Sequence, residues 1–93
     1  MKTRNEIIKD LEDRLFLLKF TRFEGIEAEQ ALGSIAGLEY CIKRHKENWT
    51  IEQFKKDLEE QKSDGLYGDY IDGWEGVLKR NIREMEGELV GSE

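Results

Sequence analysis

The stretch TRNEIIKDLEDRLFLLKFTRF, residues 3–23, carries the strongest structural signal in the chain. Its apolar residues recur at the three- and four-residue spacing of an α-helix, which predicts a helix over residues 4–22. Thr3, followed three positions later by Glu6, predicts a capping box at the start of this helix.

Two apolar stripes run along this predicted helix. The first consists of Ile7, Ile8, Leu11, Leu15 and Leu18, and the second of Phe16, Phe20 and Phe23. Together they span roughly 220° of the helix, whereas about 100° is enough for a helix that lies on the surface of a protein. One side of a small bundle cannot cover so much apolar surface. We therefore expect the second stripe to form part of an oligomer interface.

A second helix is predicted over residues 26–46, and it contains two glycines on the side opposite its main apolar face. A glycine inside a helix costs about 1 kcal/mol relative to alanine. Gly33 and Gly37, four residues apart, therefore indicate the close approach of a second backbone, and we assign them to the oligomer interface. The alternative is that they only weaken or kink the helix.

Two further helices are predicted over residues 51–62 and 69–89. The first has a capping box at Thr50 and Gln53, and Trp49 can pack onto Phe54 as a hydrophobic staple. The second carries Asn81 in the middle of its apolar stripe. A buried asparagine costs stability unless it is paired, and one established use is to fix the register between helices. We place Asn81 in the oligomer interface, with pairing to a local backbone carbonyl as the alternative.

These four helices predict an all-α protein, a small four-helix bundle with three long helices and one short one, completed by oligomerisation. With 93 residues, we expect a single helical domain over residues 1–93. The net charge is −6, which argues against a generic binder of nucleic acid or of anionic membranes. There is no apolar run of the roughly 20 residues that a membrane span needs. One cysteine and a charged N-terminus indicate the cytoplasm.

Motifs for catalysis and metal binding are missing. The only histidine, His45, and the only cysteine, Cys41, are four residues apart, but a catalytic pair would also need an orienting third group and an oxyanion site. We expect instead a half-buried histidine near a helix end and a small buried cysteine. No four-ligand zinc set, EF-hand register or phosphate loop can be written onto the sequence. We expect no catalytic residue, no bound metal and no cofactor.

Two weaker signals in the sequence favour a different function. The acids Asp69, Asp72 and Glu75 resemble, in their helical spacing alone, those that hold magnesium in small all-α nucleotide pyrophosphohydrolases. A basic cluster at residues 43–46, followed by Trp49, is too small to predict direct binding of DNA or RNA.

An acidic and aromatic segment offers the best surface for a partner protein. It contains Tyr67, Asp69, Tyr70, Asp72 and Trp74, and residues 63–78 include no base. Aromatic side chains with a polar tip often anchor interfaces, and the carboxylates favour a partner with a basic surface. The alternative for Tyr70 and Trp74 is that they begin the core stripe of the last helix.

The sequence thus predicts a small acidic, non-catalytic helical protein that forms a homodimer and docks on or inhibits another protein. A mild mimic of nucleic-acid charge is a special case of this function. No family is recognised, although the size, high charge and lack of motifs are typical of small bacteriophage open reading frames. The alternative is an all-α nucleotide-binding or magnesium-dependent nucleotide-hydrolysing domain. Its site would lie between helices of an oligomer, lined by Phe16, Phe20, Tyr40 or Trp49 with Arg22 or Arg44.

Overall fold

Four α-helices and no strand form the described part of the chain, which in this computed structural model comprises residues 3–63 and 68–87. The helices are α1 (Arg4–Phe20), α2 (Ile26–Lys46), α3 (Ile51–Ser63) and α4 (Asp69–Glu86). The expected all-α four-helix bundle is confirmed, and α1 ends two residues earlier than predicted. None of the helices in the described ranges is both long and apolar enough to cross a lipid bilayer.

The sequence signals at the helix ends act as expected. Thr3 and Glu6 form the capping box of α1, and Thr50 and Gln53 form that of α3, with reciprocal backbone-to-side-chain hydrogen bonds of 2.8–3.2 Å. The Trp49 and Phe54 rings lie 5.3 Å apart, so the predicted staple is also present. Beyond the end of α2, Asn48 adopts a left-handed backbone (φ 64°), which asparagine tolerates better than most residues and which turns the chain toward α3.

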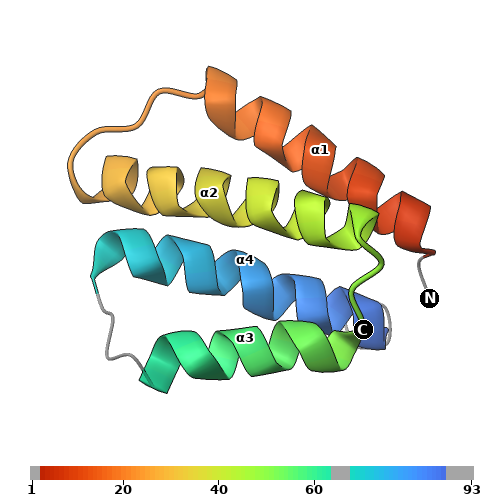
Figure 1. Ribbon diagram of the computed structural model, residues 1–93. Coiled ribbons are helices and arrows are strands. Elements are labelled where there is room, and N and C mark those ends of the chain that lie inside the picture. Colours follow the sequence, from red (N-terminus) through yellow and green to blue (C-terminus); the bar gives the residue numbers. More distant parts are fainter. Residues whose placement is uncertain (1–2, 64–67, 88–93) are drawn as a thin grey trace.

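The helices lie side by side in the order α1, α2, α4, α3 (Figure 1). α2 and α4 are therefore neighbours although α3 separates them in the sequence, and they run in the same direction. α1 crosses α2 obliquely: the two helices are close where α1 begins and α2 ends, and they diverge toward the other end of the bundle (Figure 1). A single cluster of buried apolar residues draws on all four helices, with Leu11, Leu38, Phe54 and Leu78 fully enclosed.

Three glycines let the backbones of α2 and α4 approach closely. A Cβ atom built on Gly33 would lie 1.8 Å from the carbonyl oxygen of Tyr70, and one built on Gly73 would lie 2.1 Å from that of Gln30. A Cβ on Gly37 would meet Trp74 and Val77 at 3.1–3.4 Å. We call this contact, defined by Gly33, Gly37 and Gly73, the glycine seam.

The glycine seam corrects one expectation from the sequence. Gly33 and Gly37 do mark the close approach of a second backbone, but that backbone is α4 of the same chain. Both glycines are buried in the monomer, so they do not contribute to a surface that a second copy could reach.

Candidate functional site

Within the described ranges, the large apolar side chains that are exposed come from one end of the bundle. They are Phe16, Leu17, Phe20, Ile26, Leu32 and Tyr70, and their exposed fractions run from 43% for Tyr70 to 78% for Phe20. They come from the last turns of α1 and from the first parts of α2 and α4, which all lie at the same end (Figure 1). We call these six residues the apolar end. Exposed apolar side chains that come from one end of a protein are candidates for an interaction surface.

The apolar end is exposed because α1 diverges from α2 toward its C-terminal end (Figure 1). The buried residues of α1, Ile7 and Leu11, both lie in its first half. In the second half Leu15 and Leu18 reach the core only partly, and the Phe16 and Phe20 rings pack on each other with centroids 4.7 Å apart. Phe23 is half-buried and lines a hollow beneath the end of α1. Phe16 and Phe20 are thus exposed on the surface, whereas Phe23 is half-buried below the end of α1.

Asn81 lies in the interior, where it pairs with neither of the groups considered from the sequence. Its side chain is fully buried, and its Oδ1 lies 2.6 Å from Nε2 of His45. The other ring nitrogen of His45, Nδ1, lies 2.9 Å from a guanidinium nitrogen of Arg4. Arginine can only donate, so Nδ1 accepts and Nε2 carries the proton that it donates to Asn81. A side chain of α2 thus satisfies Asn81, which is not available to an oligomer interface.

This network makes His45 a determinant of stability rather than a catalytic base. Burial lowers the pKa of His45; the hydrogen bond that His45 donates to Asn81 opposes that effect only in part, and the nearby Arg4 charge lowers the pKa further. The imidazole is therefore neutral in the folded protein at neutral pH. Cys41, one turn away, is fully buried, and burial raises its pKa to about 12. Because both nitrogens of His45 are engaged and the thiol stays protonated, these two residues do not form an activated nucleophile.

The lowered pKa of His45 predicts that the protein is less stable in mild acid. In the unfolded chain the imidazole titrates near its ordinary pKa of 6.5, so below that pH the unfolded state takes up a proton that the folded state does not. The free energy of unfolding should therefore fall as the pH drops from about 7.5 to about 5.5. Urea denaturation monitored by circular dichroism at both pH values measures this change. The His45→Leu variant, which lacks the group, should show a flat profile over the same interval, and an equal slope in both proteins would contradict the assignment.

The acidic and aromatic segment is only partly available to a partner. Tyr67 lies outside the described residues. Asp69 is half-buried in the first turn of α4, whereas Tyr70 and Asp72 are exposed. Trp74 is half-buried and packs against the core, with its ring centroid 5.6 Å from that of Tyr40. Tyr70 and Asp72 are therefore available at the surface, whereas Trp74 is part of the packing around the core.

The residues of the alternative nucleotide pocket are brought together only in part. The guanidinium of Arg44 lies 5.0 Å from the ring centroid of Tyr40 and 4.7 Å from that of Trp49. Arg44 also pairs with Glu47 at 2.8 Å, and Tyr40 donates a hydrogen bond to Asp57. The aromatic faces that would stack on a base are thus occupied by an arginine of the same chain. Phe16 and Phe20 lie far from this cluster, at the apolar end.

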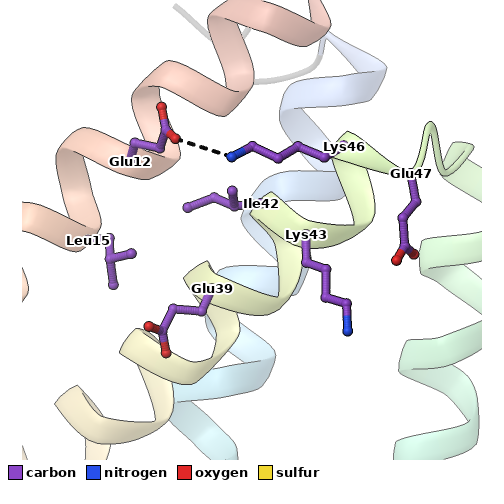
Figure 2. Close-up of a pocket in the computed structure, with 7 residues that line it drawn as sticks. All are labelled: Glu12, Leu15, Glu39, Ile42, Lys43, Lys46 and Glu47. Carbon is purple, nitrogen blue, oxygen red and sulfur yellow. Dashed lines mark ion pairs between the residues drawn. The ribbon is translucent and has the colours of Figure 1, made fainter.

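A groove between α1 and α2 has a volume of about 460 Å³ (Figure 2). Leu15 and Ile42 form its apolar base, and its charged lining consists of Glu12, Glu39, Lys43, Lys46 and Glu47. Lys46 reaches across to Glu12 at 3.7 Å (Figure 2), and Lys19 pairs with Glu39 at 3.4 Å. Charges of both signs surround the groove, and two of its carboxylates pair with lysines of the same chain. It therefore shows no preference for a ligand of one charge.

Within the part of the chain that the structure describes, no group of three or more His, Cys, Asp or Glu side chains is placed to hold a metal ion. No family model matches the chain, and comparisons with curated proteins and with solved structures give no significant match. The function is therefore inferred from the residues and their geometry.

Three residues of the apolar end were not predicted from the sequence. Leu17, Ile26 and Leu32 fall on or beside helical faces that also carry core residues, so periodicity alone does not separate them from the core. The run of apolar residues from Leu15 to Leu18 was the available signal, because four consecutive positions of a helix cannot all face one core.

Proposed function

We propose that this protein is a small, non-catalytic interaction module that forms a homodimer through its apolar end. The observation that carries the proposal is the gathering of six exposed large apolar side chains at one end of the bundle. A second copy offers the same apolar surface, and most homo-oligomers are twofold dimers in which one patch meets its own copy.

The size of the apolar end favours a second copy as its occupant. The exposed fractions of the six side chains add up to between three and four fully exposed residues. At about 200 Å² each, that is roughly 700 Å². A standard protein interface buries about 800 Å² on each partner. The exposed apolar surface at this end is thus close to the area that a standard interface buries on each partner.

Docking on a second, basic-surfaced protein is the other half of the proposal. Asp69 and Asp72 lie in the first turn of α4, and Tyr70 between them is exposed and belongs to the apolar end. The acidic surface therefore borders the dimer contact. Carboxylates at that place would steer a basic partner toward the edge of the dimer contact.

Light scattering after size-exclusion chromatography, over a tenfold dilution, tests self-association. We expect a mass of twice the 10.9 kDa of the chain, and we expect Phe20→Glu to weaken association by at least about tenfold, because it puts a charge in the centre of the contact. Phe20 is mostly exposed, so circular dichroism should show an unchanged fold.

The matched control is Asn5→Glu, which adds the same charge to an exposed position of α1, at the other end of the bundle. This variant should dimerise like the unmodified protein. A monomer at every concentration, or a Phe20→Glu variant with an unchanged mass, would sink the proposal.

A further inference from the structure

A polar hollow of about 400 Å³ lies where α1, α2 and α4 meet. Its polar lining includes Arg14 from α1, Gln30 and Ser34 from α2, and Asp72 and Arg80 from α4, and Gly73 and Gly76 form part of its wall. The hollow is distinct from the charged groove of Figure 2, because the two share no lining residue.

Two arginines face this hollow without a carboxylate partner. Nη1 of Arg14 is buried and has no hydrogen-bond partner. Among the ion pairs of the described residues, none involves Arg14 or Arg80. Burying a guanidinium nitrogen that donates to nothing is costly, since the group loses its hydration without a replacement.

A second cation, Arg80, lies near Arg14. Burial lowers the pKa of Arg14 most and the like charge of Arg80 lowers it further, whereas Glu84, Cys41 and Asp10 each raise it by a smaller amount. An anion placed between the two guanidinium groups would offset the repulsion between their charges. Guanidinium groups match the oxygens of a carboxylate or phosphate well.

Gly76, beside the glycine seam, explains why the hollow stays open. The backbones of α2 and α4 touch at Gly73, where the Ser34 hydroxyl donates to the Gly73 carbonyl at 3.4 Å. One turn further along α4, a Cβ on Gly76 would meet nothing within 4 Å. No side chain projects from this position, so the space beside Arg14 and Arg80 remains unfilled.

An apolar hollow of about 310 Å³ adjoins the polar one. It is lined by Leu17, Leu18 and Val77, and it shares Arg14, Ser34 and Val77 with its neighbour. A ligand whose charged group lies against the arginines would therefore have apolar side chains within reach of its other end.

We propose that these adjoining hollows bind a small organic anion, a carboxylate or phosphate monoester with a short apolar chain. Its oxygens would lie between Arg14 and Arg80, and its chain would run along Leu17, Leu18 and Val77. Asp72 lines the polar hollow but is exposed, so solvent screens its repulsion of the anion. The proposal does not depend on dimerisation.

Isothermal titration calorimetry with octanoate, acetate and octanol, all below micelle-forming concentrations, tests this site. Acetate supplies the charge alone and octanol the apolar chain alone, so octanoate should bind tightest. Arg80→Gln should weaken octanoate binding about tenfold or more, as expected for the loss of a charge-assisted hydrogen bond. Asp72→Asn should strengthen it.

The matched control is Arg83→Gln, which removes the same charge from an exposed position of α4 that lines a different hollow, facing α3. This variant should bind octanoate like the unmodified protein. The titrations are repeated with Phe20→Glu, because Phe20 lines neither hollow and its loss separates ligand binding from self-association. Equal binding of octanol and octanoate, equal effects of the two arginine variants, or no binding of octanoate would each overturn the proposal.

Discussion

Replacing Gly33 with alanine is expected to lower the free energy of unfolding by about 3 kcal/mol or more. The new Cβ would lie 1.8 Å from the Tyr70 carbonyl oxygen, and a backbone atom cannot rotate away as the end of a side chain can. α2 and α4 would have to separate along the glycine seam. Overpacking a core usually costs about 1–3 kcal/mol, and here two helices must move. Urea denaturation followed by circular dichroism measures the loss.

Gly76→Ala is the matched control for this prediction. Gly76 lies in the same kind of helical backbone, in α4, and a Cβ there meets nothing within 4 Å. The substitution should stabilise the protein by up to about 1 kcal/mol, because alanine favours the helix more than glycine does. If both alanine variants changed the stability by the same amount, the close packing of α2 on α4 would be wrong.

Replacing Asn81 with leucine is expected to cost about 2–4 kcal/mol. The two side chains have similar volumes, so the main loss is the acceptor for the Nε2 proton of His45. His45 is only 1% exposed, and water cannot take the place of the amide oxygen. A buried donor left without an acceptor typically costs about 1–3 kcal/mol, and the contact of the Asn81 amide nitrogen with the Met85 sulfur is lost as well.

A double-mutant cycle separates this pairing from simple packing. His45→Leu should also destabilise the protein, since it leaves the Asn81 amide oxygen without its donor and removes one acceptor from Arg4. When both residues are leucine, the mutual penalty disappears, so the double variant should be more stable than the sum of the single losses predicts by at least about 1 kcal/mol. Additive losses would show that the two residues do not depend on each other.

The helices and their starts could be read from the sequence because they depend on local chemistry. The Thr3–Glu6 and Thr50–Gln53 capping boxes each need only a few neighbouring residues, and the structure forms both. The apolar spacing of residues 26–46 likewise gave the bounds of α2. Signals of this kind do not depend on which helices become neighbours.

What could not be predicted was the partner of each face. Gly33 and Gly37 predict that a second backbone packs closely on α2. Nothing in their spacing shows whether that backbone is a helix about 40 residues further along the chain or a helix of a second copy. Asn81 presents the same ambiguity, and its pairing with His45 depends on the register between α2 and α4. In both cases the glycine seam decides the outcome, because it sets how α4 lies on α2.

The candidate sites were predictable to different degrees. Phe16 and Phe20 stood out because a single helix cannot bury apolar residues around most of its circumference, and they do lie exposed. Arg14 and Arg80 gave no signal, since single arginines on the polar side of a helix are ordinary. Only the divergence of α1 from α2 and the missing side chain at Gly76 turn them into the lining of a hollow.

The parallel pairing of α2 and α4 also bears on how the chain folds as it is synthesised. When α3 has emerged from the ribosome but α4 has not, Gly33 and Gly37 face an empty side of α2. A nascent chain of that length also lacks Val77, Leu78 and Ile82, three of the buried core residues. The first three helices thus cannot form a complete core by themselves. We expect the bundle to fold only after α4 has been synthesised.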